Sequence, residues 1–598
     1  MKLASLFAGM MMVILALAYS FDELSSIARR GTLDAAEVVL VASMVILGFS
    51  GATLMAQLPD SLRARFKALP SVRKGKQVYG FGTMLAVGVG ATLGSPLFVL
   101  IPLNVFEYEA VSFASLALAA GLSIAMAKVY SDMYRVTSDL GLPGVGGPSF
   151  TMLAVGRRSV RYFVSRLSMW VANTALAAYS MIVFVIFDFE YMPQILTSAG
   201  FNQAESTVFA DVIAIGFIGW TMFNVVLERR FLRLIGVVQV VLTSVLVAAI
   251  IVHSSQIGNA SGWDLSGIFS VGDGTAWIPA LVINTGFLYL LFFGFQEIQS
   301  LEQEALEKSA VPVLSTLRKG LKIPKASYLG KAMVLSVVIA SAVNIFYGIA
   351  VFSTHRDPAA GGSVLEIPAL FVAQAAGGTG QQALVGVAFL IATITTFVPA
   401  FLAAARHLGA LGEDGYMPRS LARLSWVFTI IAVGFLAVAN RDFLVNITDF
   451  MVLVSLGIIA LSSIWLKGIG GPRGARAKIL PAVGGGLCFL FGGAVYFIDQ
   501  SVVVFGTVAV IFAYLIFDVV ELGNLGAQLF LASSCLACLL SVGLGSESAV
   551  GGGGFSWLTD PLGGNASLML VVGLFLSAAL LTLNVIFDVK LLRRTWAG

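Results

Sequence analysis

Residues 79–103 read YGFGTMLAVGVGATLGSPLFVLIPL, and the stretch is long and apolar enough to cross a bilayer, which takes about 20 residues of helix. Its middle, residues 90–96 (GATLGSP), is a poor helix interior, because Gly costs about 1 kcal/mol and Pro about 3 kcal/mol relative to Ala. Unpaired backbone at membrane depth is tolerated only where it lines a protein-walled cavity. The stretch therefore predicts a transmembrane helix broken at its centre, with a kinked helix packed through small residues as the alternative.

A second span, residues 279–300 (PALVINTGFLYLLFFGFQEIQS), is interrupted late, at residues 292–297 (FFGFQE). Four polar residues of this span are expected at membrane depth, where polar groups usually face a bundle interior or a water-filled path. They are Asn284, Tyr289, Gln296 and Glu297. The alternative is an ordinary span that ends at Phe295, with the charges marking the interface. Half-helix ends at such breaks carry free N–H and C=O groups with aligned dipoles, which suit charged or zwitterionic solutes.

The composition assigns the chain to the integral membrane proteins. Of its 598 residues 58% are hydrophobic and 11% are charged, whereas a soluble protein has about 25% charged residues. The net charge of +4 is too small to predict a nucleic-acid partner. Cys535 and Cys538 have redox spacing but lie in an apolar run, which favours helix packing. No ATP-binding Gly-rich motif is present, so ATP-driven transport within this chain is not expected. No catalytic constellation is present either, so an enzyme is not expected.

The spacing of apolar runs predicts about sixteen transmembrane helices, or fifteen if residues 1–20 are a cleaved signal peptide. Lys and Arg concentrate in loops that the positive-inside rule places in the cytoplasm of a multi-pass cell-membrane protein. These loops are residues 59–78, 138–159, 301–330, 407–424 and 467–478. We expect four regions: an N-terminal helix pair with a basic linker (1–78), a transport core (79–466), helices eleven and twelve (479–520), and a C-terminal helix pair with a basic tail (525–598).

The two interrupted helices each open a set of five spans, residues 79–253 and 279–466. Because five is odd, the second set starts on the opposite side of the membrane from the first. Two oppositely inserted units with discontinuous first helices are typical of secondary transporters built from inverted repeats. The predicted fold class is an all-α polytopic membrane protein with a 5+5 inverted-repeat core and discontinuous helices one and six.

Four motifs in this order resemble the amino acid–polyamine–organocation superfamily of permeases. Residues 90–98 (GATLGSPLF) resemble the first-helix motif Gly-x-x-x-Gly-Ser-Gly-Ile-Phe, and residues 143–147 (PGVGG) resemble the loop after helix two. Residues 294–304 (GFQEIQSLEQE), followed by Ile323-Pro324, are similar to the sixth-helix motif, and Arg406 with residues 415–418 (GYMP) is similar to the motif after helix eight. The resemblance covers about residues 79–520 and implies a leucine-transporter-type core in which helices one and six move against a scaffold.

Three departures from the family pattern bear on the solute. Pro96 stands where the family has Gly, which removes one backbone donor for a substrate carboxylate, and Gln296 stands where Glu is frequent. Some proton-coupled members carry a Lys in helix five, but residues 238–249 (VQVVLTSVLVAA) contain none, and Leu246 takes that position. Pro96 and Gln296 leave room for a solute other than an amino acid, and the missing Lys puts a Lys-based coupling mechanism in doubt.

The resemblance and the breaks together imply the site residues. The expected substrate-binding residues are Ala91, Thr92, Gly94, Ser95, Phe293, Gly294, Phe295 and Gln296. The half-helix after Gly94 would offer N–H groups to an anionic head, and carbonyls near Thr92 and Phe293 would take an ammonium. Phe293 and Phe295 are candidates for a lid, with plain packing as the alternative.

Charged residues near the second break have separate expected roles. Glu297 is a candidate gate residue, and Glu304 is expected in a cytoplasmic charge cluster. Arg406 and Asp414 are expected to anchor loops rather than to bind the solute.

The coupling ion is either Na⁺ or H⁺, and no cofactor is expected. Thr395 and Thr396 of helix eight are candidate Na⁺ ligands, because hydroxyl oxygens suit a hard cation and no Lys occupies helix five. The alternative is that these hydroxyls bond carbonyls of their own helix one turn back.

The sequence favours a permease that moves an amino acid or related amine across the bilayer by alternating access. One alternative is a permease of the same fold for another solute, such as an inorganic cation or a nucleobase. The other is a non-transporting sensor or assembly subunit built on a permease core.

Overall fold

The computed structural model describes the chain from residue 77 to residue 510 with several gaps. The described residues are 77–139, 147–155, 159–265, 277–312, 322–354, 367–414, 424–437, 439, 441–464, 476–499, 502, 503, 506 and 510. Nine helices in these ranges are long and apolar enough to cross a membrane, and Phe81–Thr92 and Ser425–Leu436 are shorter apolar helices. The expected N-terminal and C-terminal helix pairs lie outside the described residues, as does the count of sixteen.

The first unit contains five crossings. Its helices are α4 (Phe81–Thr92), α5 (Pro96–Asp139), α7 (Val160–Ile186), continued by a π-helical turn Phe187–Tyr191 and α8 (Met192–Ser198), and α9 (Gln203–Ala260). Helix α5 reverses at Glu109, whose φ of 42° and ψ of −117° interrupt the helix. Helix α9 contains two candidate spans, Gln203–Asn224 and Leu232–Ala260. Helices α4 and the start of α5 together form crossing one.

The second unit repeats this arrangement. Its elements are α10 (Trp277–Phe287), the 3-10 turn η2 (Leu288–Phe292), α11 (Glu297–Ser300), α13 (Lys325–Phe352), α14 (Pro368–Glu413), α16 (Ser425–Leu436) and α17 (Arg441–Ser463). Helix α14 breaks at Gly377 and Gly378, so its main part is the third crossing. Five crossings per unit, each unit beginning with a discontinuous helix, confirm the predicted 5+5 inverted-repeat core.

Two short strands lie within residues 301–330, which the sequence predicts as a cytoplasmic loop. After the 3-10 turn η3 (Glu302–Glu304), strand β1 (Lys308–Ala310) pairs antiparallel with β2 (Lys322–Pro324), with Ser309 opposite Ile323. Helix α13 starts directly after β2, at Lys325. The strand pair therefore fixes the chain between helix six and helix seven.

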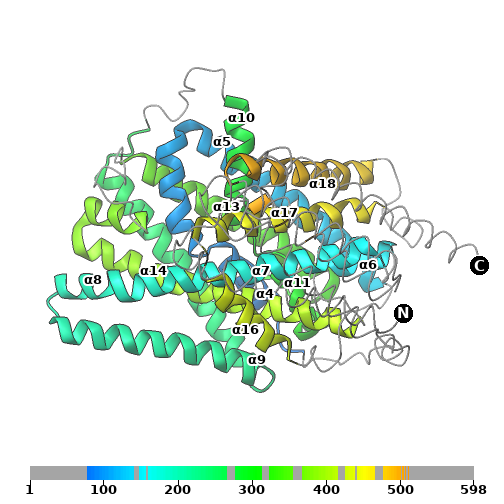
Figure 1. Cartoon of the computed structure of the whole chain (residues 1–598), viewed down its shortest axis with the longest axis horizontal. Helices are drawn as coiled ribbons and strands as arrows, with labels where there is room; N and C mark the ends of the chain where they lie inside the picture. The colour runs from blue at the N-terminus through cyan, green and yellow to red at the C-terminus, as the bar shows by residue number, and fades with distance from the viewer. Residues whose placement is uncertain are drawn as a thin grey trace, which may run out of the picture.

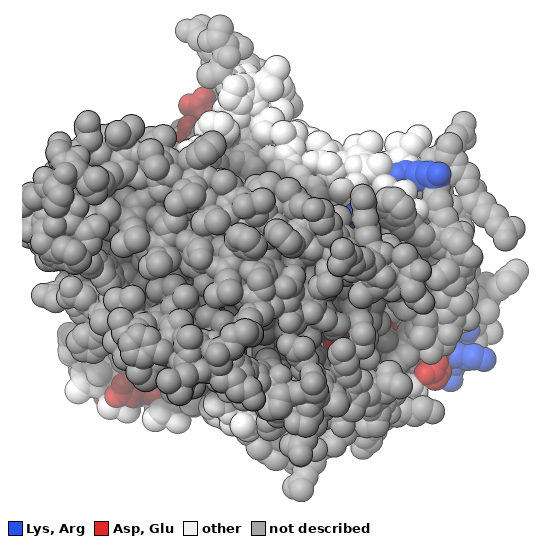
Figure 2. All heavy atoms as spheres, turned by 45° about the vertical axis from the view of Figure 1, so that its right-hand side comes forward, with Lys and Arg blue, Asp and Glu red and all other residues white. Residues whose placement is uncertain are grey.

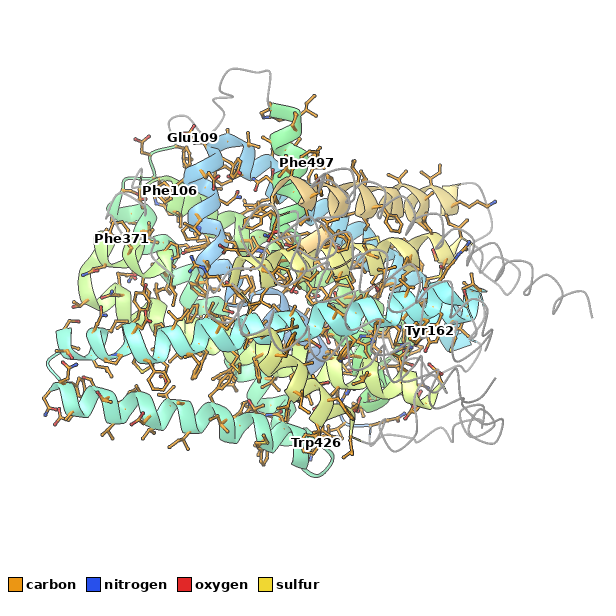
Figure 3. The ribbon with its side chains drawn as sticks, in the orientation of Figure 1. Phe106, Glu109, Tyr162, Phe371, Trp426 and Phe497 are labelled. Carbon is orange, nitrogen blue, oxygen red and sulfur yellow. The ribbon has the colours of Figure 1, made fainter. Side chains whose placement is uncertain are left out.

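Helices α7, α9 and α17 run roughly along one common direction (Figure 1), with α6 (Pro148–Val155) and α8 at opposite ends of α7. Figure 3 shows Phe106 and Phe371 at the end of the molecule that holds α8, and Tyr162 at the other end. We call the α8 end the outer end and the α6 end the inner end, following the charge pattern of the loops. Helix α18 (Arg476–Ala494) packs on α17 and is followed by a 3-10 turn, Val495–Phe497.

The surface of the described helices is apolar where it faces outward. Helix α9 exposes large hydrophobic side chains along much of its length, including Val208, Val212, Ile215 and Ile218. Of the described Lys, Arg, Asp and Glu side chains that can be seen in Figure 2, the most prominent lie toward the edges of the view. An apolar exterior of this kind suits lipid as the solvent, so the chain is a multi-pass membrane protein.

Candidate functional site

The first helix is broken where the sequence predicts. Helix α4 ends at Thr92 and α5 begins at Pro96, so Leu93, Gly94 and Ser95 connect two half-helices inside the bundle. Ser95 is fully buried and Thr92 nearly so. The break follows from Gly and Pro at its centre, because neither supports a continuous helix there.

The sixth helix is broken at Phe293–Gln296. Turn η2 ends at Phe292, Phe293 is extended (φ −74°, ψ 126°), and α11 begins at Glu297. Gly294 has a φ of 149°, a conformation that L side chains rarely adopt, which explains the glycine at this point. The backbone N–H of Gly294 donates to Oε1 of Gln296 at 3.3 Å.

The two breaks are in direct contact. A Cβ atom on Gly294 would lie 2.6 Å from the backbone N of Thr92 and 2.7 Å from Thr92 Oγ1. The structure therefore brings together Ala91, Thr92 and Gly294, which the sequence placed in one candidate site from segments about 200 residues apart. No side chain larger than hydrogen fits between the two segments at this point.

Helices five and eight adjoin the first break. A Cβ atom on Gly94 would overlap Oγ1 of Thr396, and one on Gly90 would lie 2.6 Å from Thr243 Oγ1 and 3.4 Å from Thr395 Cβ. Thr395 Oγ1 donates to the carbonyls of Ile391 (2.9 Å) and Ala392 (3.1 Å), so its proton is used within its own helix. Thr396 Oγ1 is buried and has no hydrogen-bond partner among the described residues. The role of this threonine pair as Na⁺ ligands stays a prediction.

The breaks present mainly neutral polar groups. Buried atoms without a hydrogen-bond partner in the described ranges include Ser95 Oγ, Thr396 Oγ1, Gln239 Nε2 and Gln296 Nε2. Glu297 is the first residue of α11 and is 3% exposed. The hydroxyl of Ser300 donates to the backbone carbonyl of Glu297 at 2.8 Å and lies 3.4 Å from Oε2 of the Glu297 carboxyl.

Backbone donors at the first break are fewer than expected for an anion site. Pro96 has no N–H, and the N–H groups of Leu97 and Phe98 donate to the carbonyls of Gly94 and Ser95, each at 3.1 Å. Two of the amides that were expected to receive a carboxylate are therefore already engaged. These two amides are not available to an anion, whereas the end of α4 at Thr92 carries the negative end of a helix dipole.

The two phenylalanines of the second break are packed. Phe295 is fully buried, and its ring meets that of Tyr130 on α5 edge-on, with centroids 5.5 Å apart. Phe293 is 2% exposed. For Phe295 the contact with α5 matches the packing alternative, and the lid role of either ring remains a prediction.

The inner ends of helices one and six are joined by backbone hydrogen bonds. The N–H groups of Val78 and Tyr79 donate to the Glu304 carbonyl at 2.7 and 2.8 Å, and the Leu306 N–H donates to the Tyr79 carbonyl at 2.9 Å. Phe81 N–H donates to Ser309 Oγ at 2.9 Å. We call residues 77–81 together with 304–309 the inner strap.

Side chains from helices seven and eight hold the inner strap. Arg406 donates to the Ser300 carbonyl at 2.7 Å and pairs with Glu304 Oε1 at 3.2 Å. The hydroxyl of Tyr328 donates to the Leu306 carbonyl at 2.6 Å. Asp414, farther along the chain, accepts a hydrogen bond from Tyr162 of α7. Arg406 thus contacts the inner end of helix six.

The outer half-helices are joined by a side-chain contact that the sequence did not predict. Asn104 of α5 and Asn284 of α10 exchange hydrogen bonds through both side-chain amides, with Asn284 Nδ2 at 3.0 Å from Asn104 Oδ1. Both side chains are buried. The sequence indicates Asn284 as a polar residue at membrane depth, but it does not indicate Asn104 as its partner. We call this contact the outer amide pair.

Loss of Arg406 is expected to loosen the inner strap. Arg406→Gln removes a charge-assisted pair between side chains that are 19% and 15% exposed, and such hydrogen bonds contribute about 1.5–3 kcal/mol. We expect labelling of a cysteine introduced by Ala305→Cys to become about tenfold faster, since about 1.4 kcal/mol corresponds to a factor of ten. Arg135→Gln, an exposed arginine at the inner end of α5, serves as the control, and equal labelling in both variants would contradict the role of Arg406.

Comparisons with known proteins add a likeness in overall structure. No family model matches the chain, and no curated protein matches it. One solved structure, a mutant of the Eremococcus coleocola manganese transporter, is similar with a TM-score of 0.47 at 10% identity, over 88% of this chain and 100% of that one. A second mutant of that transporter gives 0.46 at 11% identity, and its complex with an aromatic bis-isothiourea compound gives 0.44 at 12%, both with the same coverage.

The architecture itself defines the class of protein. The chain consists of two inverted five-helix units, the first helix of each unit is discontinuous, and the two breaks are in contact. It is therefore a polytopic membrane protein of the leucine-transporter-type fold. Membership of the amino acid–polyamine–organocation superfamily remains an expectation from the four motifs.

Proposed function

We propose that this chain is a secondary transporter that moves a positively charged small solute by alternating access. The observation that carries the proposal is the direct contact of two helix breaks inside the bundle. Broken helices of this kind place substrate and ion sites near the middle of the bilayer in secondary transporters. The neutral oxygens of the breaks and the Glu297 carboxyl give the site its preference for a cation.

An organic amine fits the described groups better than an amino acid or a transition metal. A zwitterionic amino acid needs donors for its carboxylate, and the amides of Leu97 and Phe98 are engaged. Transition metals prefer His, Cys, Asp or Glu ligands, and no group of three or more such residues that could hold a metal occurs in the part of the chain that the structure describes. A hard inorganic cation is the second candidate, because Ser95 and Thr396 offer buried hydroxyl oxygens.

The two closures suggest how access alternates. The inner strap holds helices one and six together at the inner end, and the outer amide pair holds them together at the outer end. We propose that each closure breaks in turn while the other persists. Solute bound between the breaks is then exposed to one side at a time.

Uptake into proteoliposomes tests this function. The purified full-length protein is offered labelled putrescine, spermidine, choline, alanine, glutamate, Rb⁺ and Mn²⁺. We expect saturable uptake of at least one amine, slower uptake of alanine, and no uptake of glutamate. The control is Gly94→Leu in the same vesicles. Uptake of glutamate alone would contradict the cation preference, and background uptake of every solute would contradict the transporter function.

A further inference from the structure

Five aromatic side chains from five different crossings form a continuous layer across the bundle. Successive ring centroids are 5.1, 5.9, 6.2 and 5.9 Å apart, and none of the five residues is more than 2% exposed. In order along the layer they are Phe187 in the π-helical turn after α7, Phe389 of α14, Phe98 of α5, Tyr347 of α13 and His253 of α9. We call these residues the outer ring layer.

The outer ring layer lies on the outer side of the first break. The N–H of Phe98 donates to the Ser95 carbonyl at 3.1 Å, so the Phe98 ring begins one helical turn beyond the break. From there α5 continues to Phe106 at the outer end (Figure 3). On α9, His253 lies about 15 Å of helix farther toward the outer end than Thr243, whose hydroxyl donates to a carbonyl of α4 at 3.1 Å. The layer therefore stands between the break and the outer end.

His253 is held in one tautomer by its neighbour on helix eight. Its Nδ1 atom lies 2.9 Å from Oε1 of Gln381, and a side-chain amide oxygen only accepts hydrogen bonds. Nδ1 of the neutral imidazole therefore carries the proton, and Nε2 presents a bare lone pair. Nε2 is buried and has no hydrogen-bond partner among the described residues.

The adjoining tyrosine leaves a second polar atom unused. The Tyr347 hydroxyl is buried without a hydrogen-bond partner in the described ranges, and its ring centroid lies 5.9 Å from that of His253. An unpaired polar atom in a protein interior costs free energy, and two phenylalanines would complete the same layer without this cost. Two such atoms in adjoining rings indicate that this part of the layer contacts a polar ligand.

The chemistry of the layer distinguishes between cations. Aromatic faces attract organic ammonium ions through the ring quadrupole. The lone pair of His253 Nε2 adds an acceptor that only a hydrogen-bond donor can use. A primary ammonium ion offers both a positive charge and N–H donors, whereas a quaternary ammonium ion offers the charge alone.

We propose that the outer ring layer is the entrance through which the solute reaches the break from outside, and that His253 selects there for ammonium ions that carry N–H groups. The rings are in contact in this structure, so they part when a solute enters. The selection rests on the proposed transport of an amine. The position of the layer on the path to the break does not depend on the nature of the solute.

Cysteine labelling tests the entrance without any solute. Ser95→Cys is placed in the full-length protein whose native cysteines are replaced by alanine, and a membrane-impermeant maleimide is added outside right-side-out vesicles. We expect Tyr347→Ala and Phe389→Ala each to speed labelling at least tenfold. The matched control is Phe184→Ala, because this buried ring of α7 stacks on Phe217, with centroids 4.2 Å apart, outside the layer.

A conservative variant separates loss of the ring from loss of the fold. Phe389→Leu keeps most of the side-chain volume, so we expect it to label nearly as slowly as the parent protein. Equally slow labelling in Tyr347→Ala, Phe389→Ala and the parent would overturn the entrance, and so would equal acceleration by Phe184→Ala.

Binding in detergent tests the selection at His253. Dissociation constants of butylammonium and of its isomer tetramethylammonium are obtained from thermal-shift titrations of the full-length protein. We expect wild type to bind butylammonium about tenfold more tightly, since a charge-assisted hydrogen bond is lost with the quaternary ion. His253→Phe keeps a ring in the layer but has no acceptor, so we expect it to bind both ions equally. His407→Phe, at a buried histidine of the inner end of α14, is expected to keep the preference.

The outcomes separate the selection from the transport function. A tenfold preference that persists in His253→Phe, or that is lost equally in His407→Phe, would overturn the selection. If neither ion binds wild type, the selection for ammonium ions is also overturned. In that case the uptake panel still decides whether the chain is a transporter, and the labelling still decides the entrance.

Discussion

Gly94→Leu is expected to reduce solute uptake to the background of empty vesicles. A Cβ atom at this position would overlap Thr396 Oγ1 and lie 3.1 Å from Pro96 Cδ, and the remaining leucine carbons would fill the space between the two half-helices. Overpacking of this kind costs about 1–3 kcal/mol, which a large helical bundle tolerates more easily than a solute site does. The measurement is initial uptake per amount of inserted protein.

Gly82→Leu is the matched control for this prediction. Gly82 lies in α4, the half-helix that leads into the break, and a Cβ atom there would meet nothing within 4 Å. The same side chain is therefore added to the same crossing without filling the break. Wild-type uptake by a well-inserted Gly94→Leu protein would show that the solute does not bind at this break.

Four described glycines have a positive φ. Among them, we expect substitution by Ala to destabilise the protein most at Gly294. The backbone conformation alone costs a non-glycine residue about 1–3 kcal/mol. In addition, the new Cβ atom would lie 2.6 Å from the Thr92 backbone N and 2.7 Å from the Ala91 carbonyl carbon, and backbone atoms cannot rotate away as a side chain can. We expect a large loss of thermal stability in detergent and a broken contact between the two breaks.

Gly378→Ala separates the two causes. Gly378 also has a positive φ, 66°, but a Cβ atom there would meet nothing within 4 Å. Its substitution therefore reports the backbone cost without the steric one. Equal shifts in melting temperature for the two variants would show that the contact between the breaks contributes nothing to stability.

The breaks were predictable because their causes are local. Gly94, Pro96 and Gly294 interrupt a helix whatever surrounds them, so the sequence located both discontinuities and, through the number of spans between them, the inversion of the two units. The contact of Gly294 with Thr92 followed from the fold class. The fold class did not predict that the N–H groups of Leu97 and Phe98, two of the expected donors, would bond within the first turn of α5. Hydrogen bonding within a first turn depends on how tightly that turn is wound.

Pairings between distant residues were not predictable from this sequence. The amides of Asn104 and Asn284 are 180 residues apart, and the crossing of helices one and six brings them together. The bridge from Tyr79 to Ala305 lies in segments that read as a helix start and a linker. Asp449, which is buried in α17, stands within a run that was assigned only as an apolar span, although a carboxyl in such a run is itself a signal. Strands β1 and β2 are too short to show a period-two pattern.

The outer amide pair has an electrical consequence. Each elementary charge that crosses the membrane field gains or loses about 2.3 kcal/mol per 100 mV, but the side chains of Asn104 and Asn284 carry no net charge and exchange only neutral hydrogen bonds. Breaking this contact moves no charge through the field. This contact therefore adds no voltage dependence to opening toward the outside, whereas a charged solute and the charged residues around the inner strap do add voltage dependence to the proposed cycle.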